Sequence, residues 1–335
     1  MRKKLKVNIV ELVGDNITIG IKLGKRIPFD KQFHLLRSLA TNVDVNEATS
    51  VIKRYSTGLL DEIKGVATGL NMDMETAIKM YSGYHLTFPS MGCTAFADSY
   101  YVRNYDFSPE LYDARVIFSK PTVGFASVGF GQQVVGRLDG MNEHGLVIGL
   151  HLVNQNHAQK GIIGTSIVRL VLERCRNTEE AIQLIADIPH SHCYNFSLLD
   201  REGHSCVIEA TPVEQVVMKE SEVMCTNHFE TVRLTAYNRN DIGGSRQRKA
   251  HLQSFLSQSY TPEEAFKKFN HENSPLFYKN YHQYFGTLYT VVYIPDSLEV
   301  MVGIGGNAKA VKFPFKDWLE GSKLERHTII GSIDY

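Results

Sequence analysis

The sequence predicts an α+β fold in which antiparallel sheets are covered by helices, and three observations support this class. The chain has 335 residues, of which 43% are hydrophobic, so it can bury a sizeable core and disorder is not expected. Residues 29–85 follow a mainly helical pattern, whereas the chain after residue 90 is rich in short strands joined by tight turns. Strands paired as hairpins, with helices in separate blocks, differ from the βαβ alternation of a doubly wound sheet.

The region before residue 90 is expected to hold several helices. Leu59, Leu60, Ile63 and Val66 recur at spacings of three and four, as one apolar helix face does. Residues Asn71 to Asp73 can start a second helix over 74–81.

Four hairpins are expected after residue 90, each marked by a polar or glycine-containing turn between apolar runs. They cover residues 93–107, 134–153, 194–212 and 286–306. Helical blocks at 165–189 and 260–269 separate them, and the second block carries a capping box formed by Thr261 and Glu264.

The overall charge and the amino-terminal segment exclude several classes of partner. Lysine plus arginine balance aspartate plus glutamate at 36 each, so no basic field attracts nucleic acid or an anionic membrane. The basic start of the chain is interrupted by Glu11 and Asp15 and lacks the apolar run of a signal peptide. The five cysteines lack CxxC spacing, which favours reduced thiols and a cytoplasmic location.

The stretch SMGCTAFA, residues 90–97, contains the main candidate for chemistry, Cys93. A cysteine here could be an ordinary buried thiol, because free cysteine is among the most buried residue types. Three features favour a nucleophile: Gly92 allows a tight backbone bend, a strand follows, and Arg103 and Asp106 stand on the return limb of the same hairpin.

This combination resembles the N-terminal nucleophile hydrolases. Within them it is similar to the acyl-coenzyme A:6-aminopenicillanate acyltransferases and the related choloylglycine hydrolases, which include bile salt hydrolase and penicillin V acylase. The motifs follow in family order: MGCTAFA (91–97), YVRNYDF (101–107), DGMNEHGLVIGL (139–150), NFSLLDREG (195–203), VIEATP (207–212), CTNHF (225–229) and GGSRQR (243–248). Segments 11–27 and 58–77 resemble the helical leader of the acyltransferases, whereas bile salt hydrolase precursors carry almost nothing before the cysteine.

The resemblance implies a four-layer αββα sandwich with two antiparallel sheets. It also implies that residues 1–92 form a helical leader, and residues 93–335 the core, after cleavage between Gly92 and Cys93. Cleavage would free an α-amine on Cys93, whose reference pKa of about 7.7–8.0 lets it accept the thiol proton near neutral pH. The thiolate would then attack an amide or thioester carbonyl of a small-molecule substrate.

The resemblance also assigns roles to four further residues. Asp106 would contact the freed amine, and Arg103 would lower the thiol pKa. The side-chain amide of Asn227 would donate to the oxyanion, and Arg246 matches the late active-site arginine of the family. Read without the family, Asp106 and Asn227 also fit local turn hydrogen bonds, Arg103 fits a solvated surface charge and Arg246 fits a basic helix start.

One position departs from the family pattern. Choloylglycine hydrolases carry an oxyanion asparagine in a Gly-Leu-Asn run, where this chain has Gly149-Leu150-His151. The candidates for the second donor are therefore His151, Asn154 or a backbone N–H. Tyr105 and Phe107 are candidates for substrate contact, together with the aromatic loops at 107–113 and 271–286.

The histidines and glycine-rich stretches do not indicate a cofactor. No HxxxH or CxxC spacing supports a metal site, and neither GFGQQVVG nor GIGGNAK fits a phosphate loop. The predicted function is an autoprocessing cysteine amidohydrolase or acyltransferase acting on linear amides, assembled as a homo-oligomer (dimer or tetramer), as is usual in the family. The alternatives are a bile salt or penicillin V amidase, an uncut cysteine–histidine hydrolase, or a non-catalytic binding protein on the same scaffold.

Overall fold

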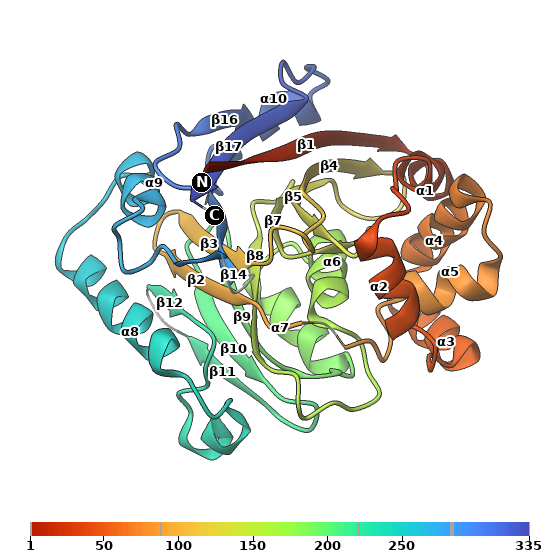
Figure 1. The fold of residues 1–335 in the computed structure, drawn as a ribbon, viewed down its shortest axis with the longest axis horizontal. Helices are drawn as coiled ribbons and strands as arrows, with labels where there is room; N and C mark the ends of the chain where they lie inside the picture. Colours follow the sequence, from red (N-terminus) through yellow and green to blue (C-terminus); the bar gives the residue numbers. More distant parts are fainter. Residues whose placement is uncertain (1, 88, 220–221, 282–284, 335) are drawn as a thin grey trace.

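Two β-sheets stacked face to face form the centre of the structure, and helices cover both outer faces (Figure 1). The computed structural model describes residues 2–87, 89–219, 222–281 and 285–334. Between the sheets, the ring of Phe130 stacks on that of Tyr289 with their centroids 3.5 Å apart. The α+β class and the four-layer order predicted from the sequence are therefore confirmed.

The larger sheet has ten strands within the described residues, in the order β11-β10-β9-β8-β7-β5-β4-β1-β17, with β6 paired to β5. Its strands are β1 (Arg2–Gly14), β4 (Arg115–Pro121), β5 (Ser127–Gln132), β6 (Gly136–Arg137), β7 (Asp139–Asn142), β8 (Val147–Asn154), β9 (Cys193–Leu199), β10 (Ser205–Ala210), β11 (Gln215–Lys219) and β17 (Thr328–Asp334).

The smaller sheet has seven strands in the same described part, in the order β12-β2-β3-β14-β15-β16, with β13 paired to β14. Its strands are β2 (Gly92–Ala97), β3 (Tyr101–Phe107), β12 (Val223–Cys225), β13 (Lys279–Asn280), β14 (Phe285–Ile294), β15 (Glu299–Ile304) and β16 (Val311–Pro314). All four predicted hairpins are present, as the pairs β2–β3, β7–β8, β9–β10 and β14–β15.

The helices lie on opposite sides of the two sheets (Figure 1). Those on the larger-sheet side are α1 (Asn16–Gly24), α2 (Lys31–Leu39), α3 (Val45–Tyr55), α4 (Thr57–Leu70), α5 (Met74–Tyr81), α6 (Gly164–Arg174) and α7 (Thr178–Asp187). On the other side, α8 (Gly243–Leu252) contacts β2 and β12, and α9 (Pro262–Asn270) contacts β3 and β14. Three shorter helices complete the described elements: η1 (Val232–Tyr237), η2 (Gln253–Ser257) and α10 (Phe315–Leu319). None of the described helices is both long and apolar enough to cross a bilayer.

The segment before Cys93 contains a strand that the sequence prediction did not include. Strand β1 lies between β4 and β17 in the larger sheet, so residues 1–92 are not purely helical. Its pairing with β4 is parallel, which also corrects the prediction of two wholly antiparallel sheets. The segment is therefore built into the sheet that supports the rest of the chain.

A buried ion network joins this segment to the remainder of the chain. Glu62 on α4 pairs with Arg169 on α6 at 2.7 Å, and Arg169 also pairs with Glu173 at 2.5 Å. The three side chains are at most 3% exposed, so their attraction is little screened by water.

Glu62→Gln is expected to lower the free energy of unfolding by about 3–5 kcal/mol, because it leaves Arg169 buried with part of its charge uncompensated. The neighbouring Asp61→Asn removes an exposed pair with Lys64 and is expected to cost about 0–1 kcal/mol. Urea unfolding of both variants measures the difference. Equal losses would show that the network does not hold the segment in place.

Candidate active site

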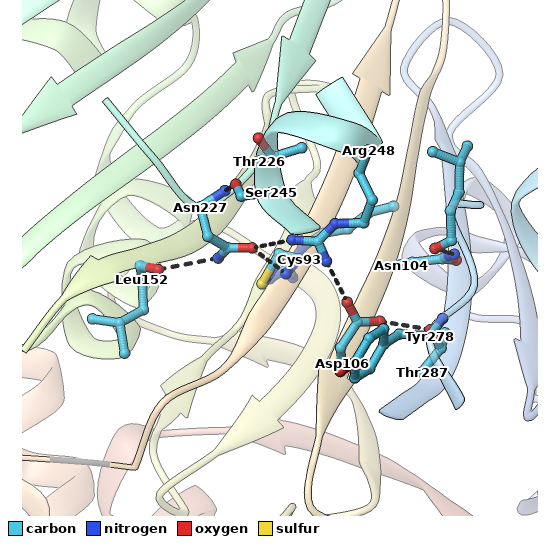
Figure 2. A network of polar contacts seen from close by, with 12 residues as sticks. Cys93, Asn104, Asp106, Leu152, Thr226, Asn227, Ser245, Arg248, Tyr278 and Thr287 are labelled. Atoms are coloured by element: carbon cyan, nitrogen blue, oxygen red, sulfur yellow. Dashed lines mark hydrogen bonds and ion pairs between the residues drawn. The ribbon is translucent and has the colours of Figure 1, made fainter. Parts of the chain in front are cut away.

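Cys93 lies on β2, between β12 and β3 of the smaller sheet, and Arg103 links its thiol to β8 of the larger sheet. Cys93 pairs with Tyr105 on β3, and its side chain is 0% exposed. Figure 2 shows its backbone nitrogen directed at Asn227 and the guanidinium of Arg248 beside them. The predicted nucleophile is thus held on a rigid, buried strand.

Arg103 reaches from β3 to the thiol and to the opposite sheet. Its Nη2 donates to Cys93 Sγ at 3.0 Å and to the carbonyl of Leu150 on β8 at 2.5 Å. Its Nη1 forms a buried ion pair with Asp139, whose carboxylate also accepts the hydroxyls of Tyr289 and Tyr293 at 2.6 and 2.5 Å. The cation beside the thiol is therefore fixed by a buried carboxylate and two tyrosines.

The pKa of the Cys93 thiol is raised, whereas the sequence analysis expected Arg103 to lower it. Burial raises the pKa of the Cys93 thiol above its ordinary value, and the charge of Arg103 opposes this only in part. The direction in the intact chain is upward because the thiol has no contact with water.

Asn227 follows β12 and contacts Cys93 through its carbonyl oxygen. The N–H of Cys93 donates to Asn227 Oδ1 at 2.7 Å. Asn227 Nδ2 donates to the carbonyl of Leu152 at 3.1 Å, and the N–H of Asn227 donates to Ser245 Oγ at 2.8 Å. The amide nitrogen of Asn227 therefore faces β8, and its oxygen faces the backbone of Cys93.

Arg248, which sequence reasoning passed over, joins the remaining groups of the site. It donates to Asn227 Oδ1 and to Asp106 Oδ2, each at 3.0 Å (Figure 2). The structure does not bring the predicted Arg246 to this site: its side chain is exposed on α8. The helical period could have indicated Arg248, because it lies three residues after Ser245 and so on the same helix face, and Ser245 contacts Asn227.

Asp106 does not contact the nitrogen of Cys93, as the resemblance implied that it would. It accepts Thr287 Oγ1 at 2.6 Å and Arg248 at 3.0 Å, whereas the N–H of Cys93 goes to Asn227. Burial raises the pKa of Asp106, and the charge of Arg248 acts against that rise. Asp106 pairs across the hairpin with Gly92, so its carboxylate lies against the peptide before the cysteine.

Gly92 is required by this close approach. A Cβ at this position would lie 2.9 Å from Asp106 Oδ2 and 2.9 Å from the ring of Phe285. Asp106 is fully buried, so its carboxylate cannot shift without disturbing the site.

Gly92→Ala is expected to lower the free energy of unfolding by about 1–3 kcal/mol through overpacking. The matched control is Gly244→Ala on α8, where an added Cβ meets nothing within 4 Å and little change is expected. Thermal unfolding of the two variants compares them. A Gly92→Ala variant as stable as the control would mean that the strand accommodates the extra methyl group.

The other predicted residues divide into those near the thiol and those away from it. His151 on β8 bonds Ser197 Oγ at 2.8 Å, and burial, together with Arg103 and Arg248, lowers the pKa of its ring well below the ordinary value. The backbone of Cys93 is close enough to that ring to affect the pKa. Asn154 is not brought to Cys93, because it bonds the carbonyl of Tyr237 and the N–H of Asn156, each at 2.9 Å.

The aromatic candidates lie along β3, which pairs with the strand of Cys93. The ring of Tyr105 is 5.7 Å from that of Phe107, and its buried hydroxyl has no hydrogen-bond partner. Part of the second aromatic loop, residues 282–284, lies outside the described residues. Among the residues that are described, no group of three His, Cys, Asp or Glu side chains is placed to hold a metal ion.

A comparison with protein families matches residues 93–309 to acyl-coenzyme A:6-aminopenicillanic acid acyl-transferase. The chain belongs to this family. The matched region begins at Cys93 and contains Arg103, Asp106, Asn227 and Arg248. Membership of this acyl-transferase family confirms the resemblance seen in the motifs and supports chemistry on amide bonds.

Solved structures with a similar fold were also found, at low sequence identity. Penicillin V acylase from Agrobacterium tumefaciens is 14% identical, with 67% of this chain and 86% of that chain covered and a TM-score of 0.45. A mutant conjugated bile acid hydrolase from Clostridium perfringens is 14% identical, with 73% of this chain and 97% of that chain covered and a TM-score of 0.46. The Caenorhabditis elegans ortholog of N-acylethanolamine-hydrolyzing acid amidase is 10% identical, with 61% of this chain and 93% of that chain covered and a TM-score of 0.41. A comparison with curated protein sequences gave no match.

Proposed function

We propose that this acyl-transferase family member cleaves its own chain at Gly92–Cys93 and then acts on linear amides through the thiol of Cys93. The observation that carries the proposal is the convergence on one residue: Arg103 contacts the thiol at 3.0 Å and Asn227 accepts the N–H at 2.7 Å. A structural cysteine needs neither a buried cation at its sulfur nor a polar network at its nitrogen.

The cleavage follows from the position of the thiol next to the peptide bond. The Cys93 thiol attacks the carbonyl carbon of Gly92, so a C–S bond forms and the C–N bond breaks, while the thiol proton passes to the leaving nitrogen. Water then attacks the resulting thioester, which releases the carboxylate of Gly92 and returns the thiol. Residues 1–92 and 93–335 become two chains, held together by β1 and by the network around Glu62.

The freed amine of Cys93 would remain among the groups that now surround its N–H. Asn227 Oδ1 accepts from it, and Arg248 holds Asn227 and Asp106 in place from the other side. An amine at this position takes the thiol proton, after which the thiolate attacks a substrate carbonyl and releases an amine. Water or a second amine then takes the acyl group from the thioester.

The oxyanion formed in these steps needs a hydrogen-bond donor near Cys93. His151 is a candidate, because its lowered pKa keeps the ring neutral and its Nδ1 has no hydrogen-bond partner. Asn227 Nδ2 is the second candidate once it leaves the carbonyl of Leu152. One such donor typically contributes a factor of about 100–1000 in rate.

The uncut cysteine–histidine hydrolase is not favoured by the geometry. Within the described residues the thiol contacts Arg103, and the nearby His151 bonds Ser197 instead. A non-catalytic scaffold would keep the fold but never expose the thiol. Consistent with the family resemblance, we propose a small-molecule amide or acyl-thioester substrate, a cytoplasmic location and a homo-oligomeric assembly.

The proposal is tested by incubating the purified protein with a panel of acyl-p-nitroanilides and acyl thioesters and measuring the mass of the 93–335 chain. The expected result is release of the leaving group and an acyl adduct that maps to Cys93. A Cys225→Ala variant, which removes another buried thiol, should behave like the wild type. An adduct that maps to a different cysteine, or turnover that survives Cys93→Ala, would refute the assignment.

A further inference from the structure

Three polar side chains next to Asn227 form a hydrogen-bonded chain that ends on its backbone. The N–H of Asn227 donates to Ser245 Oγ at 2.8 Å, and Ser245 Oγ lies 2.9 Å from Nδ1 of His228. Thr226 Oγ1 lies 3.1 Å from the same ring nitrogen. Thr226, His228 and Ser245 are each at most 7% exposed, so water competes little for these bonds.

The donors and acceptors of this chain follow from the protons that each group carries. Ser245 Oγ accepts the N–H of Asn227, so its own proton needs an acceptor, and Nδ1 of His228 is the one it contacts among the described residues. The hydroxyl proton of Thr226 needs the same acceptor. A neutral ring with its proton on Nε2 serves both hydroxyls, whereas a proton on Nδ1 would deprive both of their acceptor.

Ser245 also sets the position of α8 relative to the site. It lies in the first turn of that helix, three residues before Arg248, so the two side chains share a helix face. Arg248 donates to Asn227 Oδ1 and to Asp106 Oδ2, each at 3.0 Å. The bond between Ser245 and the backbone of Asn227 therefore holds α8 where Arg248 reaches both groups.

The charges around His228 favour its neutral form. Burial lowers the pKa of His228, Glu230 acts in the opposite direction, and three cations on α8 lower the pKa further. The cations are Lys249, Arg246 and Arg248. Glu209 on β10 also faces this turn, but its carboxylate accepts the N–H groups of residues 230 and 231 at 2.6 and 3.1 Å. From β9 the uncharged Asn195 donates to the carbonyl of His228 at 2.9 Å.

We propose that His228 and Ser245 are positioning residues for the reaction at Cys93: the neutral ring takes the hydroxyl proton of Ser245, and Ser245 then holds the backbone of Asn227 and the first turn of α8. Both act through Asn227 and Arg248 rather than on the sulfur. Protonation of the ring in acid turns Nδ1 into a donor, so Ser245 loses its acceptor and Asn227 is held less firmly. The inference rests on the cleavage proposed for the Gly92–Cys93 bond.

The first test follows cleavage with time after cell-free synthesis of the chain. His228→Phe and Ser245→Ala are each expected to slow it about 3–10-fold, the value of one hydrogen bond. His228→Asn is expected to recover most of the rate, because an amide oxygen can replace Nδ1 as the acceptor. The matched control is His190→Phe, which removes another buried histidine, bonded to the carbonyl of Ile185 at 2.9 Å, and should leave the rate unchanged. Equal slowing by His190→Phe and His228→Phe would overturn the proposal.

The pH profile of cleavage gives a result that a merely structural role would not produce. As the pH falls, protonation of His228 should slow the wild type, whereas His228→Asn has no titrating group here and should keep its rate to lower pH. Cys93 and Asp106 titrate in both proteins, so a difference between the two profiles belongs to His228. Identical profiles would contradict the role given to the neutral ring.

A measurement that needs no cleavage separates this inference from the proposed function. In the Cys93→Ala protein, hydrogen exchange of the Asn227 N–H is expected to become about 3–10-fold faster with His228→Phe or Ser245→Ala. His228→Asn and His190→Phe should leave it unchanged. Exchange that none of the variants alters would overturn the positioning role, whatever the cleavage assay shows. The expected exchange rates together with an uncut wild type would support the relay and refute only the cleavage.

Discussion

Arg248→Met is expected to slow cleavage at Gly92–Cys93 about 100-fold, whereas Arg246→Met on the same helix leaves the rate unchanged. Arg248 fixes both Asn227 and Asp106, which flank the Gly92–Cys93 peptide, and a displacement of about 1 Å in such groups costs roughly that factor. The fraction of uncut chain is followed with time after cell-free synthesis.

The pair of variants separates position from charge. Both substitutions remove one arginine from α8, so a general electrostatic effect would slow both equally. Slow cleavage in Arg246→Met with normal cleavage in Arg248→Met would contradict the site as described. Arg248→Lys should recover only part of the rate, because a single ammonium group cannot match the planar fork of arginine.

Arg103→Met is expected to stop detectable cleavage and to lower the free energy of unfolding by about 3–5 kcal/mol. Cleavage stops because the substitution removes the cation that contacts the sulfur. The loss of stability follows because Asp139 keeps its charge in the core without its partner. Both effects are measured in one preparation, by mass spectrometry and by urea unfolding.

The double variant Arg103→Met/Asp139→Asn distinguishes the two roles of the arginine. Asparagine carries no charge. Its Oδ1 can accept from one of the two tyrosine hydroxyls and its Nδ2 can donate to the oxygen of the other, so most of the stability should return. Cleavage should not return, since no cation faces the thiol. A double variant that is stable and cleaves normally would show that Arg103 serves only the fold.

The hairpins could be predicted from the sequence because their signals are local. Alternating apolar residues and a polar turn predict β2–β3 and β7–β8 without knowledge of the rest of the chain. Strand β1 also alternates, with Leu5, Val7 and Ile9 buried between exposed or half-buried polar residues. Its parallel pairing with β4 joins residues more than one hundred positions apart, and no local pattern carries that information.

The candidate site shows the same limit. Cys93, Arg103 and Asp106 share one hairpin, so their proximity followed from register alone. The choice between Arg246 and Arg248 depended on the phase of α8 relative to Ser245, which is set by packing against Asn227. Likewise, the raised pKa of the thiol came from burial between two sheets, which the charge of Arg103 alone could not reveal.

The most direct test of the central claim is the intact mass, under denaturing conditions, of the purified wild type beside Cys93→Ala. We expect two chains in the wild type, with the second beginning at Cys93, and a single uncut chain in the variant. A wild type that stays uncut after prolonged incubation, or a variant that is cut at the same bond, would contradict it.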